Sequence, residues 1–187
     1  SRNVELVDVR TAGNGWGGVA LYTTDVLGIN GVSDVTIDGT FDEPNPVYAQ
    51  LSKMPEGGAV IEKIVLDGFG YAVLNPVCAP GYTIYQVDED AAIAYALALN
   101  ADDACADAST VQRLERDADG YVTLGDFIVG TDGTSEMSLQ AAVDAAPAGA
   151  TIELTEGTFK PQATTRVFEP LTITGRPGTV IQAEAPL

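Results

Sequence analysis

Residues 138–159 read Ser138-Leu-Gln-Ala-Ala-Val-Asp-Ala-Ala-Pro-Ala-Gly-Ala-Thr-Ile-Glu-Leu-Thr-Glu-Gly-Thr-Phe159. The apolar residues of the first half recur three and four positions apart, which places them on one face of a short helix. A serine hydroxyl, of Ser135 or Ser138, is placed to cap the exposed amides at the start of this helix. Pro147 and Gly149 end it, because proline cannot continue a helix and glycine turns freely.

Strand-like segments follow this helix. Ile152 and Leu154 alternate with polar residues, and Phe159 comes after a break at Gly157. Two further stretches, residues 171–175 and 179–182, repeat the alternating pattern. A period of two residues predicts strands that bury one face. The sequence therefore predicts a helix followed by a succession of short strands.

The order of these elements resembles a known family. The stretches that carry the resemblance are Gln140-Ala-Ala-Val-Asp-Ala-Ala-Pro-Ala-Gly-Ala-Thr-Ile-Glu-Leu154, Gly157-Thr-Phe159 and Pro170-Leu-Thr-Ile-Thr-Gly175. Together they resemble the opening of right-handed parallel β-helices of the pectin-lyase-like type. In that family the helix plugs the N-terminal end of the solenoid, and the strands form its first coils. The fold hosts lyases, hydrolases, adhesins and structural fibres, so the resemblance implies little about chemistry.

The N-terminal third contains an internal repeat. Val35-Thr-Ile-Asp-Gly39 and Ile64-Val-Leu-Asp-Gly68 share one formula, and Val4-Glu-Leu-Val-Asp8 is a looser copy. An interval of about 30 residues with a strand-like core is typical of solenoid coils. Residues 14–23 also resemble late coils of large tandem bacterial surface proteins of this fold. Residues 1–77 are therefore predicted to be β-helix coils without an N-terminal cap.

The middle of the chain has a different pattern. Residues 82–86 alternate as a strand, and Asp88 is placed to cap a helix over residues 89–99, which are rich in alanine and leucine. Residues 111–116 and 121–129 then predict a hairpin around an Asp-Gly turn. The expected fold is mainly β: right-handed parallel β-helix coils at both ends, joined by a mixed segment with one helix. Its three segments are 1–77 (uncapped coils), 78–130 (bridging segment) and 131–187 (capping helix and first coils).

The charge of the chain limits its partners. Its 187 residues include 27 acids and 9 bases, a net charge of −18. Nucleic acid and anionic membrane surfaces would be repelled, so neither is an expected partner. No apolar run is long enough to insert into a membrane. The acidity suits an extracellular or cell-surface protein, and it is equally explained by solubility alone.

The two cysteines are predicted to form one disulfide. Cys78 and Cys105 are the only cysteines, and no CxxC motif occurs. In a secreted chain such a pair closes the intervening loop. The alternative is two unpaired buried thiols. Because the chain has no histidine, a conventional zinc site is not expected.

One loop has the spacing of a calcium site. Residues 115–126 place acids at positions 1, 3, 5 and 12, with glycine at position 6. The predicted ligands of Ca²⁺ are Glu115, Asp117, Asp119 and Asp126. Glutamate at position 1 and strand-like flanks depart from the usual helix–loop–helix pattern. The alternative interpretation is an ordinary Asp-Gly hairpin turn.

Catalytic machinery is sparse in this sequence. Without histidine, Ser-His-Asp and Cys-His mechanisms are excluded for this chain. A pair of carboxylates remains formally possible, but only a bare Asp102-Asp103 pair resembles the acids of the related hydrolases. The arginine that related lyases use as a base has no clear counterpart. Arg10, Arg166 and Arg176 are each predicted to be surface arginines.

These observations favour a non-enzymatic module and leave catalysis undecided. The predicted function is an extracellular structural or adhesive module that self-associates head-to-tail into a filament or tandem array by coil-on-coil stacking. The alternatives are a fragment of a calcium-dependent polysaccharide lyase or hydrolase, or a carbohydrate-binding module that recognises glycans. No cofactor other than Ca²⁺ is expected.

Overall fold

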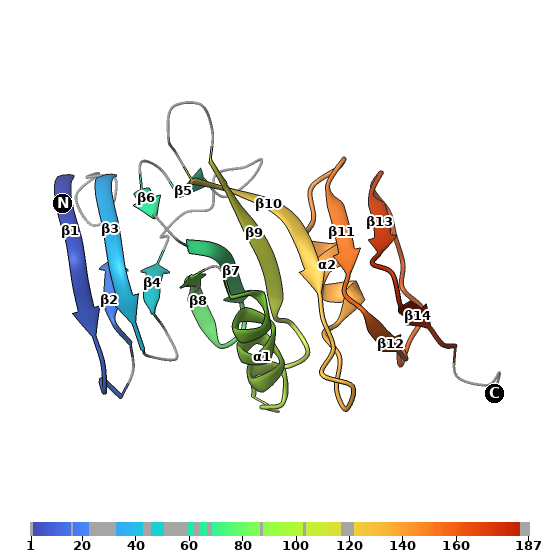
Figure 1. Cartoon of the computed structure of the whole chain (residues 1–187). Helices are drawn as coiled ribbons and strands as arrows, with labels where there is room; N and C mark the ends of the chain where they lie inside the picture. The colour runs from blue at the N-terminus through green and yellow to red at the C-terminus, as the bar shows by residue number, and fades with distance from the viewer. Residues whose placement is uncertain are drawn as a thin grey trace.

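A computed structural model gives the fold of the chain, which is mainly β (Figure 1). It describes residues 2–15, 17–22, 33–42, 46–50, 60–61, 64–66, 69–86, 88–102, 104–116 and 122–183. In the N-terminal part the strands are β1 (Arg2–Thr11), β2 (Val19–Tyr22), β3 (Ser33–Phe41), β4 (Val47–Gln50), β5 (Val60–Ile61), β6 (Ile64–Leu66), β7 (Phe69–Asn75) and β8 (Ala79–Gln86). The C-terminal part contains α1 (Glu89–Asn100), β9 (Thr110–Arg116), β10 (Val122–Val129), α2 (Leu139–Ala145), β11 (Thr151–Leu154), β12 (Gly157–Phe159), β13 (Thr172–Gly175) and β14 (Thr179–Ile181).

The described strands form three sheets. The largest has nine strands, eight of them in the order β13-β11-β10-β9-β7-β8-β4-β2, with β5 paired to β10. A three-stranded sheet has the order β1-β3-β6, and β12 pairs with β14. The nine-stranded sheet takes strands from all three segments of the chain, so it runs from one end of the molecule to the other (Figure 1).

The repeated formulas of the N-terminal third form strands in register. Val4 pairs with Val35, and Val35 pairs with Ile64, all in parallel ladders. The strand predicted over residues 171–175 likewise pairs in parallel with β11, and that over 179–182 with β12. The local periodicity therefore identified these strands correctly.

The predicted β-helix is nevertheless wrong. Between the parallel pairs at the two ends, β7, β8, β9 and β10 pair with one another in antiparallel fashion, and β8 is antiparallel to β4. The nine-stranded sheet is therefore mixed, and neither a solenoid nor coils at both ends describes the fold. Strand β7 lies near the centre of the large sheet and was not predicted. It interrupts the succession of coils that the resemblance implied.

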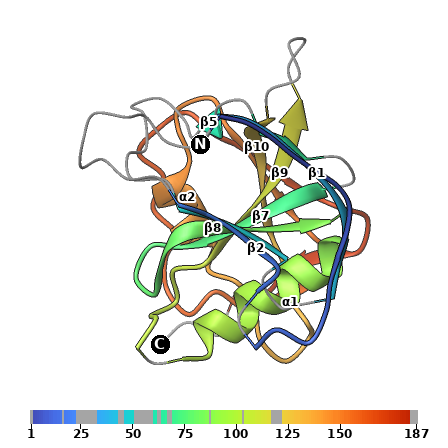
Figure 2. The ribbon, with the colours of Figure 1, turned by 90° about the vertical axis from the view of Figure 1, so that its left-hand side faces the viewer.

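Both predicted helices are present. Asp88 caps α1 by accepting a hydrogen bond from the backbone N–H of Ala91 at 3.0 Å. Ser138, rather than Ser135, caps α2 by accepting from the N–H of Ala141 at 3.1 Å. Viewed from the β1 end, the two helices lie on different sides of the central strands (Figure 2).

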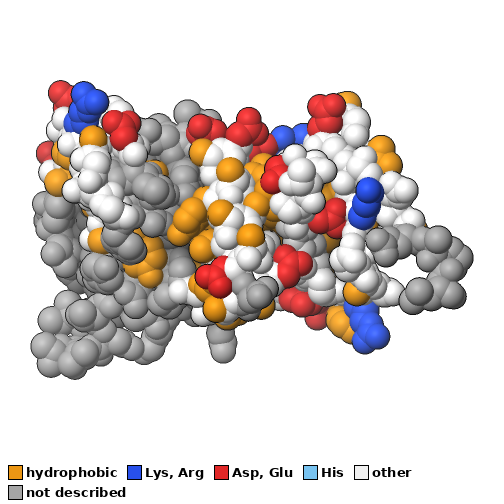
Figure 3. All heavy atoms as spheres, turned by 90° about the horizontal axis from the view of Figure 1, so that it is seen from below, with side chains coloured by type: hydrophobic (Ala, Val, Ile, Leu, Met, Phe, Trp, Pro, Cys, Tyr) orange, Lys and Arg blue, Asp and Glu red, His pale blue; other side chains and the backbone are white. Residues whose placement is uncertain are grey.

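The main core lies between the helices and the central strands. It combines buried residues of α1, α2 and the strands β7, β9, β10, β11 and β12. From below, acidic groups are scattered among apolar ones around the middle of the molecule, where α1 lies (Figure 3). Within the described residues, no helix is long and apolar enough to cross a membrane.

Candidate functional site

The C-terminal edge of the sheets is open. Strand β13 pairs with β11 on one side, and β14 pairs with β12; the described residues place no strand on the outer side of either. All four residues of β13 are exposed, whereas β11 alternates between partly and fully buried residues. Unpaired N–H and C=O groups on an edge strand are a template for pairing with another strand.

The apolar core continues to this edge, where its last side chains are exposed; we call it the unfinished core. Phe127, Ile152 and Ile173 are register partners on three successive parallel strands, so their side chains point to the same face. Their exposed fractions are 3%, 0% and 40% in that order. In the smaller sheet Phe159 is 3% exposed, and its partner Ile181 is 56% exposed. A further strand with apolar side chains on each of the two sheets would cover Ile173 on one and Ile181 on the other.

The N-terminal end shows the same arrangement on the opposite side of the molecule (Figure 1). There β2 pairs with β4 and β1 with β3, and the described residues place no strand beyond β1 or β2. Partly buried Val19 is the register partner of Val47, which is 0% exposed. Partly buried Leu6 is the partner of Ile37, also 0% exposed. Each end thus has two edge strands with partly open inward side chains.

The two edges of the large sheet have the same strand sense. Strands β13, β11 and β10 are parallel, β9 is opposite to them, and β7 returns to the first sense. Strand β8 is opposite again, and β4 and β2 return to the sense of β13. Strands β13 and β2 could therefore pair in parallel if two copies met end to end. Because sheets twist by about 20° per strand, the second copy would also be rotated.

Four charged side chains fasten the C-terminal edge to α1. We call Glu89, Arg113, Glu153 and Arg176 the ion cluster. Arg176 follows β13; it donates from Nη2 to Glu89 Oε2 at 3.0 Å and from Nε to Glu153. Arg113 on β9 donates from Nη2 to Glu153 Oε1 at 3.1 Å and lies 3.7 Å from Glu89 Oε2. The cluster therefore joins the start of α1, two strands and the chain just beyond the edge strand.

The protonation of the ion cluster follows from its geometry. Hydrogen bonds from Arg176 lower the pKa of Glu89 against an opposing effect of burial. Hydrogen bonds from Arg113 do the same for Glu153. Burial raises the pKa of Tyr71, and a hydrogen bond to Glu89 adds to that rise. The negative charges of two carboxylates balance the positive charges of two guanidinium groups. The ion cluster is therefore suited to holding structural elements together rather than to acid–base catalysis.

An open groove adjoins the apolar edge. Its cavity volume is about 620 Å³, and it lies between the turn after β10, strand β12 and the chain that follows β12. Burial and the nearby charge of Glu136 raise the pKa of Asp107. A carboxylate oxygen of Glu136 accepts the backbone N–H of Lys160. Phe159 and Ile181 also line the groove, so it is continuous with the unfinished core.

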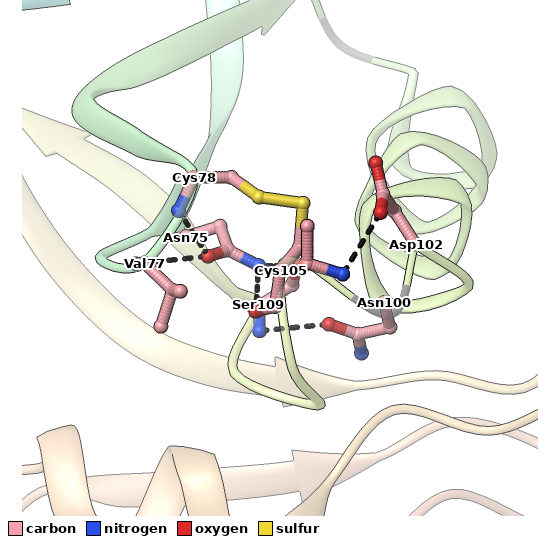
Figure 4. Close-up of a disulfide and its surroundings, with 8 residues drawn as sticks. Asn75, Val77, Cys78, Asn100, Asp102, Cys105 and Ser109 are labelled. Atoms are coloured by element: carbon pink, nitrogen blue, oxygen red, sulfur yellow. Dashed lines mark hydrogen bonds between the residues drawn. A yellow bond between two sulfur atoms is a disulfide. The ribbon is translucent and has the colours of Figure 1, made fainter.

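The predicted disulfide is present. Cys78 and Cys105 are bonded, with their Cα atoms 5.0 Å apart (Figure 4). Beside them, Asn75 is fully buried; its Nδ2 donates to Ser109 Oγ at 3.0 Å and to the carbonyl of Cys105 at 3.4 Å. Its Oδ1 accepts the backbone N–H groups of Val77 and Cys78, both at 3.0 Å. The turn after β7 is thus tied to the loop after α1.

The calcium loop stays a prediction. Glu115 lies near the end of β9, opposite Thr123, and Asp126 lies where the register of β9 and β10 shifts. Asp117 and Asp119 lie outside the described residues. Among the residues that are described, no group of three or more acids or cysteines is arranged to hold a metal ion.

The predicted surface arginines differ in their surroundings. Arg10 forms an exposed ion pair with Asp42 at 3.6 Å. Arg166 is exposed and meets Gln140 through its backbone. Arg176, by contrast, belongs to the ion cluster. Sequence reasoning missed this because its partner Glu89 is 87 positions away. Arg113, a base within the first strand of the predicted hairpin in a chain with few bases, was the one available signal of a paired charge.

No family model matches the chain, and no curated protein and no solved structure matches it either. The expected membership of the pectin-lyase-like family therefore finds no support, in agreement with the mixed sheets.

Proposed function

We propose that the chain is a non-enzymatic extracellular structural or adhesive module that assembles head-to-tail by strand addition at its C-terminal edge. One observation carries the proposal: the core rows that end at Ile173 and Ile181 are exposed at edge strands beside which the described residues place no further strand. Covering such side chains releases about 25 cal/mol per Å² of apolar area. The backbone of the added strand would satisfy the outward N–H and C=O groups of β13, which no described strand pairs.

Two further features support the proposal. The ion cluster holds β13 against α1, so the edge is a fixed template rather than a loose strand. The disulfide agrees with an oxidising compartment such as the extracellular space. The mode of assembly differs from the coil-on-coil stacking expected from the sequence, because it requires only parallel pairing between edge strands.

The test is self-association as a function of concentration. Sedimentation velocity of the wild type is expected to show a mass that grows with protein concentration, and electron microscopy is expected to show linear particles. Ile173→Lys places a charge in the unfinished core row and is expected to give monomers. Thr172→Lys is the matched control, because this exposed residue of the same strand faces the other side of the sheet. Circular dichroism checks that both variants fold.

Two results would overturn the proposal. One is a wild-type protein that remains monomeric at the highest attainable concentration. The other is equal loss of assembly in Ile173→Lys and Thr172→Lys, which would show that the apolar row is not what drives association.

A further inference from the structure

We infer that the strand that binds beside β13 is β2 of a second copy of this chain, paired in parallel. This inference rests on the proposed function, and it specifies the partner and the geometry of the junction. The occupant is identified by three properties that β2 has: it is an edge strand, it has the required sense, and it presents an apolar side chain to the same row.

Strand sense is the first argument. β13 and β2 are the two edges of one sheet and run in the same sense along its ladder. Pairing the β13 edge of one copy with the β2 edge of another therefore gives a parallel pair. Both strands already pair in parallel on their inner sides, β13 with β11 and β2 with β4. The junction would repeat the kind of ladder present on either side of it.

Side-chain complementarity is the second argument. The row that ends at Ile173, which is 40% exposed, needs one apolar side chain on its outer side. On β2 the corresponding inward residue is Val19, whose partner Val47 is fully buried. Joining the edges would place Val19 beside Ile173 and continue the row from Ile152 to Val47. Both strands have four residues, so neither leaves a long overhang.

The contact is heterologous, because it joins two different edges. A β13 edge that paired with another β13 edge would give a closed dimer related by a twofold axis, in which the two strands are antiparallel. The β13–β2 contact instead leaves a free β2 edge at one end of every assembly and a free β13 edge at the other. Growth therefore continues, and the twist of the sheet makes the array helical.

Cysteine cross-linking distinguishes these arrangements. Thr174 and Ala20 are exposed residues of β13 and β2 on the face opposite to the apolar row. The two native cysteines are bonded to each other, so a short bis-maleimide reacts only with introduced thiols. We would prepare Thr174→Cys, Ala20→Cys and the double variant, and treat each one and a mixture of the single variants.

The expected result is specific to a head-to-tail contact. Each single variant alone yields no covalent dimer, the mixture yields dimers, and the double variant yields a ladder of multimers. Covalent dimers of Thr174→Cys alone would overturn the inference and establish an edge-to-edge dimer. Assembly by sedimentation without cross-links in the mixture would also overturn it, while leaving the proposed function intact. A monomeric wild type would overturn both.

Discussion

Replacing Arg176 with glutamine should destabilise the protein through the ion cluster. The variant leaves Glu89 and Glu153 with Arg113 as their remaining cation in the cluster. Their side chains are 17% and 24% exposed, between those of a surface pair and a buried one. A surface ion pair contributes about 0.2–1 kcal/mol, and breaking a buried pair costs about 3–5 kcal/mol. We expect the free energy of unfolding to fall by about 1–3 kcal/mol, and the melting temperature by about 3–10 °C.

The loss in free energy of unfolding caused by Arg176→Gln should depend on pH in a defined direction. The pKa values of Glu89 and Glu153 are lower in the folded protein than their ordinary value of 4.5. A carboxyl group with a lowered folded pKa stabilises the fold above its unfolded pKa, and this contribution disappears as pH falls through the folded pKa. The difference in free energy of unfolding between wild type and Arg176→Gln should therefore be fully present at neutral pH and become smaller below about pH 4.5.

The assay is urea unfolding followed by circular dichroism, at neutral pH and at several acidic values. Arg166→Gln is the matched control: it removes the same charge from an exposed position whose described contacts use backbone atoms. Equal unfolding midpoints for wild type and Arg176→Gln at pH 7 would show that the cluster contributes no net stability. A difference that persists unchanged after both carboxyl groups are protonated would refute its electrostatic origin.

Three further predictions concern other parts of the chain. Replacing Cys78 and Cys105 with serine should lower the free energy of unfolding by about 3.5 kcal/mol, the loop-closure estimate for a separation of 27 residues. Thermal unfolding with and without reductant measures this loss, and an unchanged melting temperature would contradict the prediction. Gly130→Ala should cost about 1–3 kcal/mol, because the added carbon would lie 2.6 Å from a methyl carbon of buried Ile93; urea unfolding measures this loss, and wild-type stability would show that the core relaxes freely. If the predicted calcium loop binds its ion, calorimetric titration will show saturable uptake of Ca²⁺ that Asp119→Asn weakens, and the absence of heat in the wild type would end that hypothesis.

Local signals in the sequence identified most elements but not their partners. The apolar spacing and capping residues of α1 and α2 are contained within single stretches, so both helices were predicted close to their observed bounds. The alternation around Val35 and Ile64 likewise identified real strands. Alternation has the same period in parallel and antiparallel ladders, however, so it does not specify the direction of a strand's neighbour. This is why strands that were predicted correctly led to a wrong prediction of the fold.

The central strand β7 and the ion cluster show where sequence reasoning failed. In β7, Tyr71 and Val73 face one side while Ala72 faces the other, and the run has no polar alternation to mark it. A strand with apolar residues on both faces is recognised mainly by its surroundings. The ion cluster joins residues from α1, β9, β11 and the turn after β13. No local spacing brings such residues together, because the mixed topology alone does so.

The disulfide also decides how the chain would respond to a pulling force. Tension applied between β1 and β14, which lie in the two smaller sheets at opposite ends of the molecule, acts across the strands, so that ladder hydrogen bonds are loaded one after another rather than all at once (Figure 1). The bond between Cys78 and Cys105 carries the force past the 27-residue interval that contains β8 and α1. The backbone between the two cysteines therefore cannot be extended, and the fully extended length of the chain is shorter by about 90 Å than it would be without the bond. Under load, a module in such an array would thus extend over only part of its chain. Helix α1 would stay within the disulfide-closed loop while the sheets on either side unfolded.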